Sequence, residues 1–244
     1  MPTAISIVEN EDGFAVASDS AYYDMATGTA APNYIQKIFP VDRSDLSIAY
    51  CLCGIVTFAA IDKHGQPPVF SLFTEVPRIL TAMDKMATLH QFAEAFGKRL
   101  CTRLRKATNP LPANKPSETY VFLFGYYNGL PGLEIVEISR DANPLECTVF
   151  PGNAPYNIVT ACFPGAVRDH FYSDPVFEPF RAKDCPHSGI QAALEIARQS
   201  VLACYDPEVR SKYPEAGVVG GPIHVAKITR AGFEWIEPPE SVAI

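Results

Sequence analysis

In the first third of the chain, apolar residues fall into short runs separated by turn residues. The runs cover residues 4–8, 14–18, 34–39 and 46–52. The first two flank a polar stretch that ends in Asp12-Gly13, a pair favoured in tight hairpin turns. The pattern predicts a β-hairpin. Because a hairpin brings its two ends together, Thr3 and Asp19 are expected to be neighbours.

Two longer segments have the period of amphipathic helices. Residues 88–106 and 189–204 place apolar side chains three and four positions apart, with polar side chains opposite. The apolar positions are Leu89, Phe92, Ala93, Phe96, Leu100 and Leu104 in the first, and Ile190, Ala193, Leu194, Ala197, Val201 and Leu202 in the second. Both segments are therefore predicted to be helices with one buried face.

Another helix is expected earlier in the chain. The sequence predicts that it begins near Gly54, is interrupted at residues 63–68 and resumes from Leu72 to Met86. Pro77 should kink or restart this helix, since proline cannot donate the helical hydrogen bond.

The remaining apolar runs predict strands joined by loops. These strands cover residues 119–126, 133–138, 145–150, 156–162, 222–229 and 232–236, the last two joined by a turn at Arg230-Ala231. Residues 109–118 predict a loop and residues 237–244 a loose tail. Strands and helices thus come in groups rather than in strict alternation. Such grouping favours a single α+β domain over residues 1–244, with antiparallel sheets covered by helices, rather than a parallel sheet.

Composition and charge indicate a globular protein and argue against nucleic-acid and membrane partners. The chain has 244 residues, of which 48% are hydrophobic and 19% charged, as is typical of a globular protein with a sizeable core. The formal charge of −7 argues against a nucleic-acid partner, which would need a basic face. The sequence has no apolar run long enough to cross a membrane and no secretory signal pattern. A membrane partner is therefore not expected.

Cysteines and histidines show no pattern of a metal or disulfide framework. The seven cysteines form no Cys-x-x-Cys motif, and the five histidines form no cluster with metal-ligand spacing. We therefore expect reduced thiols, a cytoplasmic location, and neither a metal nor a cofactor.

Thr3, Asp19 and Lys37 together suggest acyl-transfer chemistry. If processing exposes Thr3 as the first residue, its α-amine has a reference pKa of about 7.7–8.0, which suits a general base at neutral pH. The amine could take the proton of the threonine hydroxyl, which then attacks a carbonyl carbon. A nearby Lys37 would lower the pKa of this amine, and Asp19 would orient and neutralise the lysine.

Five segments resemble those of proteasome β-type subunits and their bacterial relatives among the N-terminal-nucleophile hydrolases. Residues 3–19 are similar to the start of a mature subunit, and the other four to its lysine segment, its glycine-containing turn, its central strand pair and its closing strand pair. They read "TAISIVENEDGFAVASD" at 3–19, "QKIF" at 36–39, "CLCGIVTFAAID" at 51–62, "FLFGYYNGLPGLEIVEIS" at 122–139 and "VVGGPIHVAKITRAGFEWI" at 218–236.

The resemblance implies both a fold and an activity. The implied fold is a four-layer αββα sandwich of two antiparallel sheets. The implied activity is hydrolysis of peptide or amide bonds in a peptide or protein substrate, with Thr3 as nucleophile and Gly54 as oxyanion donor. It also implies self-association into a ring. The sequence does not identify an unfoldase partner.

Each of these residues also has a simpler reading. Asp19 could close a strand and cap a turn, Lys37 could be a solvated charge at a strand edge, and Gly54 could merely permit a tight turn. An apolar specificity pocket is suggested by three residues that could equally be ordinary core: Leu52, Val56 and Ala60.

Three departures from the family pattern favour a second hypothesis, a catalytically inactive subunit that acts as a scaffold or assembly module. Pro2 precedes Thr3, where self-cleaving members usually have glycine. Ala161-Cys162-Phe163 replaces a Gly-Ser-Gly segment. Ala216 and Val219 stand where the family often has aspartate and serine.

Two other catalytic arrangements are open from the sequence. Cys162 with His170 and Asp169 could form a thiol site, although a cysteine in an apolar strand usually only packs. Pro2, freed of Met1, would be a secondary amine able to act as a base.

Overall fold

The computed structural model describes most of the chain, in two compact units. The first unit comprises residues 1–39 and 153–244, and the second residues 40–152. The described residues are 3–21, 23–24, 29–30, 34–54, 56–59, 69–107, 119–139, 146–152, 158–161, 165–181 and 189–239. The predicted loop at 109–118 and the end of the predicted tail, residues 240–244, lie outside them.

The first unit is built on a five-stranded antiparallel sheet in the order β12-β1-β2-β13-β14. Its strands are β1 Ile5–Asn10, β2 Gly13–Ser18, β12 Ile158–Ala161, β13 His224–Thr229 and β14 Gly232–Glu237. A separate two-stranded ribbon pairs β3 Tyr23–Asp24 with β4 Thr29–Ala30. The predicted closing pair and its turn at Arg230-Ala231 are confirmed.

The predicted hairpin is β1 and β2, and it lies in the middle of this sheet. The turn is tighter than the polar stretch suggests, because Asn10 and Gly13 already pair across it. The Asn10 side chain accepts hydrogen bonds from the backbone N–H groups of Asp12 and Gly13, which fixes the turn. A Cβ atom at Gly13 would lie 2.1 Å from the Ile228 carbonyl oxygen of β13, so only glycine allows this approach.

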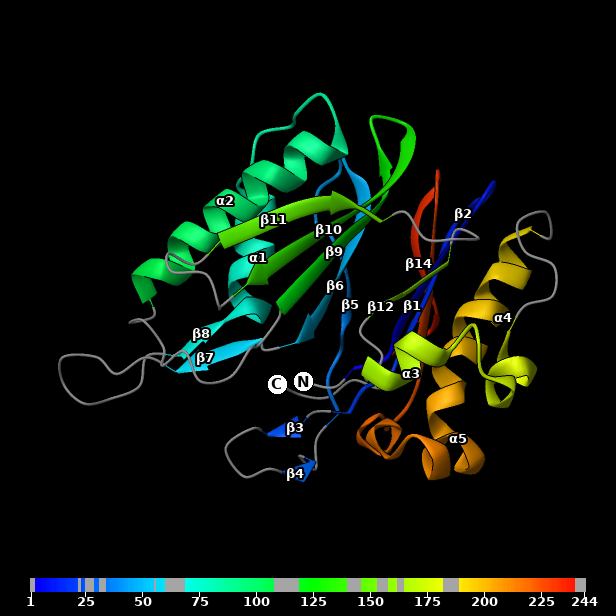
Figure 1. Ribbon diagram of the computed structural model, residues 1–244. Coiled ribbons are helices and arrows are strands. Elements are labelled where there is room, and N and C mark those ends of the chain that lie inside the picture. The colour runs from blue at the N-terminus through cyan, green and yellow to red at the C-terminus, as the bar shows by residue number, and fades with distance from the viewer. Residues whose placement is uncertain are drawn as a thin grey trace. The chain divides into compact units, whose positions relative to one another are not determined.

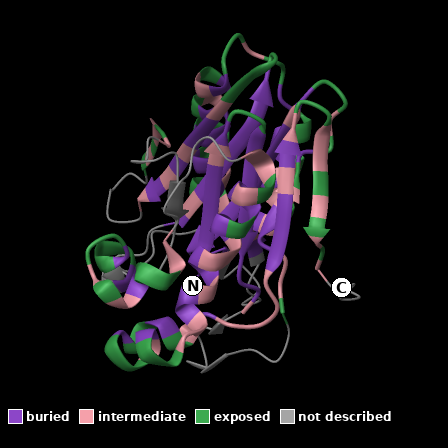
Figure 2. Ribbon diagram, turned by 90° about the vertical axis from the view of Figure 1, so that its right-hand side faces the viewer, coloured by how far each residue is buried: buried purple, intermediate pink, exposed green. Residues whose placement is uncertain are grey.

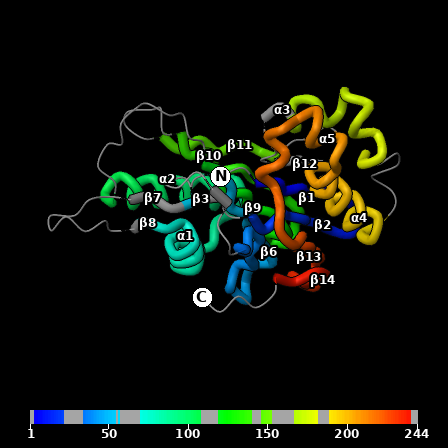
Figure 3. Tube along the Cα trace, turned by 90° about the horizontal axis from the view of Figure 1, so that it is seen from below, coloured from blue at the N-terminus to red at the C-terminus, as the bar shows by residue number. Residues whose placement is uncertain are grey.

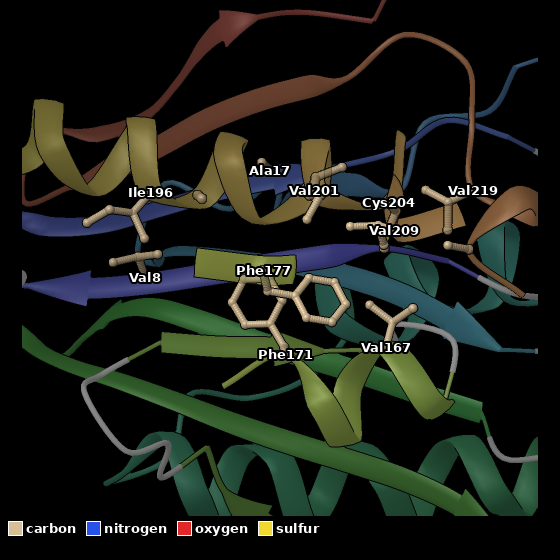
Figure 4. Close-up of a cluster of buried hydrophobic side chains, with 14 of the residues drawn as sticks. Val8, Ala17, Val167, Phe171, Phe177, Ile196, Val201, Cys204, Val209 and Val219 are labelled. Carbon is tan, nitrogen blue, oxygen red and sulfur yellow. The ribbon is translucent and has the colours of Figure 1, made fainter. Parts of the chain in front are cut away.

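The helices of the first unit bury its core against one face of the sheet. They are α3 Gly165–His170, α4 Gly189–Leu202 and α5 Pro207–Lys212, with short 3-10 turns η2 Pro175–Phe180, η3 Ala203–Tyr205 and η4 Pro214–Val218. Helix α4, predicted over 189–204, packs on β1 and β2 (Figures 1 and 3). Figure 4 shows Val8 of β1 against Ile196 of α4, and Cys204, Val209 and Val219 gathered beyond the end of that helix.

The second unit contains a second five-stranded antiparallel sheet, in the order β11-β10-β9-β6-β5. Its strands are β5 Ile38–Pro40, of which the first two residues belong to the first unit, β6 Ser47–Gly54, β9 Thr119–Tyr127, β10 Leu130–Ser139 and β11 Glu146–Pro151. A small ribbon pairs β7 Thr57–Ala59 with β8 Val69–Ser71. Helix α2 Leu89–Ala107, as predicted from its period, lies on β10 and β11 (Figure 1).

The predicted helix start near Gly54 and the predicted helix end at Met86 are wrong, whereas the predicted resumption at Leu72 is confirmed. The helix expected from Gly54 is replaced at residues 57–59 by strand β7, because Thr57 and Phe58 suit a strand and pair with β8. The resumed helix, α1 Leu72–Thr81, ends five residues before Met86 and contains Pro77 without interruption. Arg43 accounts for the early end, since its guanidinium donates hydrogen bonds to the carbonyls of Leu80 and Met83.

The fold class is α+β, with two antiparallel sheets and helices packed on each, as the sequence pattern predicts. In Figure 2 most strand residues are buried, whereas the helices carry exposed residues along their outer sides. Among the described residues no helix is long and apolar enough to cross a membrane. The description of residues 1–244 as a single domain stays a prediction.

Candidate functional site

The hairpin brings the start of the chain to Asp19, as the sequence predicts. The backbone N–H of Asp19 donates to the Ala4 carbonyl at 3.0 Å. In return the Ala4 N–H donates to Asp19 Oδ1 at 2.9 Å. Thr3 precedes Ala4 directly and is fully buried. The carboxylate of Asp19 therefore lies beside the peptide that follows Thr3.

Lys37 completes this cluster. Its Nζ donates to Asp19 Oδ1 at 2.7 Å, and the two side chains are only 1% and 0% exposed. Burial lowers the pKa of the Lys37 ammonium, whereas the charge and hydrogen bond of Asp19 oppose that shift. The Lys37 ammonium and the Ala4 N–H thus share one carboxylate oxygen in a site closed to solvent.

The second carboxylate oxygen of Asp19 is also bound by backbone groups. The N–H groups of Ala21 and Gly220 both donate to Oδ2, each at 3.3 Å. The Gly220 carbonyl in turn accepts from the N–H groups of Ser20 and Ala21, at 3.1 and 2.9 Å. Ser20 also donates through its hydroxyl to the Pro222 carbonyl at 2.7 Å. The segment before β13 therefore fixes the position of the Asp19 side chain.

Gly221 makes this close approach possible. Its φ is +77°, and a Cβ there would lie 2.5 Å from Ser20 Oγ and 2.5 Å from a ring carbon of Tyr34. Its carbonyl accepts a 2.7 Å hydrogen bond from the Tyr205 hydroxyl. Sequence reasoning did not assign Gly220 and Gly221 to the site. The signal was present, because a Gly-Gly pair directly before a strand marks backbone approaching other backbone.

Two neighbouring groups are kept uncharged. Burial, followed by the negative charge of Asp19, raises the pKa of the Tyr205 hydroxyl and of the Cys204 thiol. Both therefore stay protonated at neutral pH, which makes Cys204 a poor nucleophile. What the cluster offers chemically is a carboxylate with several backbone donors, which binds both a buried ammonium and the peptide that follows a threonine.

The other predicted site residues belong to the second unit. Gly54 is the last residue of β6, pairs with Thr119 and has φ of +85°. That backbone conformation suits the tight-turn reading, and its role as an oxyanion donor stays a prediction. Leu52 and Val56 are buried at 1% exposure each, while Ala60 lies outside the described residues. The proposed specificity pocket therefore also stays a prediction.

The alternative thiol site finds no support in the described residues. Asp169 and His170 are exposed on α3, where Asp169 pairs with Arg168 at 3.0 Å and the His170 ring stacks on Tyr213. Cys162 lies outside the described residues, as does Pro2. No group of three or more histidine, cysteine, aspartate or glutamate side chains within the described ranges could hold a metal ion.

The departures at Ala216 and Val219 have a clear structural meaning. Both side chains are buried, at 0% and 1% exposure, in the hydrophobic core of the first unit. These positions therefore contribute packing and neither an acid nor a hydroxyl to the neighbouring Gly220 segment.

The expectation of reduced thiols needs one correction. Cys51, Cys101, Cys147 and Cys204 are free, whereas Cys53 is disulfide-bonded. Sequence could not reveal this bond, because it depends on which cysteines the fold brings together rather than on spacing.

Comparison with known proteins shows the fold. No family model matches the chain, and no curated protein matches it by sequence. Among solved structures it is similar to Anbu (ancestral beta-subunit) from Yersinia bercovieri. The TM-score is 0.54 at 13% sequence identity, over 98% of this chain and 88% of that one. At this identity the likeness shows the fold alone, which is proteasome-like, as the αββα expectation has it.

Proposed function

We propose that this protein is a proteasome-like N-terminal-nucleophile hydrolase that cleaves peptide or amide bonds with Thr3. The observation that carries the proposal is the meeting of Lys37 and the Ala4 backbone at one oxygen of Asp19. A buried lysine–aspartate pair costs desolvation energy, and an ordinary strand end does not require one. Its place beside Thr3 suits a nucleophile that has to be activated.

In the proposed mechanism, processing removes Met1 and Pro2 and frees the α-amine of Thr3. The amine accepts the proton of the Thr3 hydroxyl, whose oxygen attacks the substrate carbonyl carbon. The Lys37 ammonium lowers the pKa of the amine by charge repulsion and stabilises negative charge on the attacking oxygen. Collapse of the tetrahedral intermediate expels the leaving amine and forms an acyl-Thr3 ester, which water then hydrolyses.

The resemblance assigns the remaining functions to residues 52–60. A backbone N–H at Gly54 would donate to the oxyanion, a contact worth about 2.7–4 kcal/mol in comparable sites. Leu52, Val56 and Ala60 would line an apolar pocket for one substrate side chain. No metal or cofactor is needed for these steps.

The proposed setting follows from the neighbour named above, which is described as a β-subunit. We infer that this chain also works as a subunit, in a cytoplasmic homo-oligomer with ring symmetry. A ring would confine the site and keep folded proteins away from it. Size-exclusion chromatography with light scattering tests this part separately, since a monomer at all concentrations contradicts it.

Intact mass and N-terminal sequencing test the mechanism most directly. Loss of both Met1 and Pro2 is the expected result, because only then is the Thr3 amine free. Turnover of fluorogenic peptides should follow and should disappear in Thr3→Ala. Thr102→Ala, which changes an exposed threonine on α2, is the matched control and should keep wild-type turnover. Equal rates of peptide turnover in wild type and Thr3→Ala would refute the proposal.

The competing function is a catalytically inactive subunit that acts as a scaffold or assembly module. Pro2 ahead of Thr3 and the buried apolar side chains of Ala216 and Val219 favour it. A purified protein that retains Pro2, forms the oligomer and turns over no peptide would decide for this function.

A further inference from the structure

A pair of cysteines in the second unit lies outside everything assigned to the proposed site. Cys101 is on helix α2 and Cys147 on strand β11, which is an edge strand of its sheet. Helix α2 packs on β10 and β11 (Figures 1 and 3). Cys101 is 3% exposed, Cys147 is half-buried, and both are free thiols.

A glycine brings the two thiols together. Gly97 lies one helical turn before Cys101, and a Cβ at Gly97 would be 2.8 Å from the Sγ atom of Cys147. The bare backbone at Gly97 therefore accommodates the sulfur from the strand. The two thiols also share a side-chain hydrogen bond. The Cys147 sulfur thus lies over α2 within one helical turn of Cys101, on a strand that packs against this helix.

The two thiols have different acidities. The hydrogen bond from Cys147 lowers the pKa of Cys101, and the positive charge of Arg105, one turn further along α2, lowers it as well. The same hydrogen bond and burial raise the pKa of Cys147. By contrast, burial alone raises the pKa of Cys51 in β6. The pair therefore combines a thiol with a lowered pKa and a thiol with a raised pKa.

We propose that Cys101 and Cys147 form an oxidation site, at which hydrogen peroxide converts the dithiol into an intramolecular disulfide. The Cys101 thiolate attacks one peroxide oxygen, so that an S–O bond forms and the O–O bond breaks. The departing hydroxide takes a proton and leaves as water. The Cys147 sulfur then attacks the sulfur of Cys101, and the S–O bond breaks. The hydroxyl leaves with the Cys147 proton as a second water. Each pair of thiols loses two electrons and two protons to one peroxide.

The bond would tie an edge strand to a helix. Among the strands that the structure describes, β11 pairs with β10 alone. A covalent link from β11 to α2 closes the chain between residues 101 and 147 and restricts the unfolded state. The oxidised protein is expected to melt about 5 °C or more above the reduced one.

Peptide mapping of the full-length protein tests the proposal. Chymotrypsin should release residues 101–104 and 146–156, each of which contains a single cysteine. After brief treatment with hydrogen peroxide and alkylation of remaining thiols, these two peptides should appear joined, at 2 Da below the sum of their masses. The joined peptide should be absent in Cys101→Ser and in Cys147→Ser. Cys51→Ser, which removes a buried free thiol of the same unit, should retain it.

Two results would overturn the inference. One is oxidation of either cysteine to sulfinic or sulfonic acid without a joined peptide. The other is alkylation of both cysteines, after peroxide treatment, to the same extent as in the untreated protein. Both readouts use the wild-type protein, so the test does not depend on whether the variants fold. Neither readout involves peptide turnover, so the outcome is independent of the proposed hydrolase activity.

Discussion

Lys37 and Asp19 form a buried ion pair in which Asp19 has several hydrogen-bond partners besides Lys37, whereas the partner of Lys37 is Asp19. Asp19 accepts from Lys37 and also from the backbone N–H groups of Ala4, Ala21 and Gly220. Within the described part of the chain, Lys37 Nζ donates to Asp19 alone. If Lys37 is removed, the Asp19 carboxylate therefore keeps its backbone hydrogen bonds. If Asp19 is removed, the Lys37 ammonium loses the acceptor that it has among the described residues.

The asymmetry predicts unequal costs of removing each partner. Asp19→Ala should lower the free energy of unfolding by about 3–5 kcal/mol, since it leaves a buried charge without a partner. Lys37→Met should cost less, because the three backbone donors still satisfy Asp19. The double variant should be more stable than Asp19→Ala. Urea unfolding gives these values, with the exposed Lys98→Met as a control near zero. If Asp19→Ala and Lys98→Met behave alike, the buried pair does not exist in solution.

Gly221 provides a test of the segment that holds Asp19. Gly221→Ala should destabilise the protein by about 2–5 kcal/mol, since it adds steric overlap with Ser20 and Tyr34 to the strain of a positive φ. Gly129→Ala is the matched control. Its φ of +78° is nearly the same, but a Cβ there would meet nothing within 4 Å. Thermal or urea unfolding should show that Gly221→Ala is clearly less stable than Gly129→Ala. An equal loss of stability in the two variants would contradict the close approach of Gly221 to Ser20 and Tyr34.

Phe177 anchors the core beneath α4. It is fully buried, with its ring 5.3 Å from that of Phe171 and 5.4 Å from that of Tyr213. Phe177→Ala should cost about 3–5 kcal/mol through lost burial and the cavity left behind. Leu130→Ala removes a large apolar side chain that is 71% exposed and should change stability by less than about 0.5 kcal/mol. A small effect of Phe177→Ala would show that this part of the core is not packed as described.

His90 and Glu134 predict a pH dependence in the second unit. Glu134 Oε2 lies 2.9 Å from His90 Nδ1, and this hydrogen bond and charge raise the pKa of the imidazole. Since the folded pKa is above the unfolded value of about 6.5, the stabilisation is full below that pH and is lost as pH rises through the folded pKa. Because the His90 side chain is 45% exposed, solvent screening should keep this contribution to stability below about 1 kcal/mol.

An NMR titration of the His90 imidazole measures this directly. Glu134→Gln should return its pKa toward the ordinary value. Glu94→Gln, whose carboxylate is 3.8 Å from the other ring nitrogen, should shift it less. A His90 pKa that is equal in wild type and Glu134→Gln would refute the assignment.

Local patterns allowed much of the fold to be predicted. The β1–β2 hairpin and helices α2 and α4 have clear periods, and each is bounded by turn residues close in sequence. The proximity of Thr3 and Asp19 follows from the same hairpin, because its register fixes which residues face each other. Short-range information was sufficient wherever the partners lie within one hairpin or one helix.

The wrong or missing predictions concern features that depend on contacts between residues far apart in the sequence. The end of helix α1 involves Arg43, about 40 positions upstream, which donates to the carbonyls of Leu80 in the helix and of Met83 beyond it. Strand β7 forms because it pairs with β8, across residues that give no clear strand signal. Gly220 was missed as a partner of Asp19 because 201 positions separate them. Periodicity within a segment contains no information on such contacts.

The link between Asp19 and Gly220 also constrains how the protein comes into being. A ribosome makes a chain from its N-terminus, so Thr3, Asp19 and Lys37 are made before the glycine that binds the carboxylate, which follows Asp19 by 201 positions. A nascent chain therefore cannot have a finished cluster, and a product cut short before residue 220 would lack it permanently. Such a dependence delays any reactivity at Thr3 until the segment around residue 220 has been made.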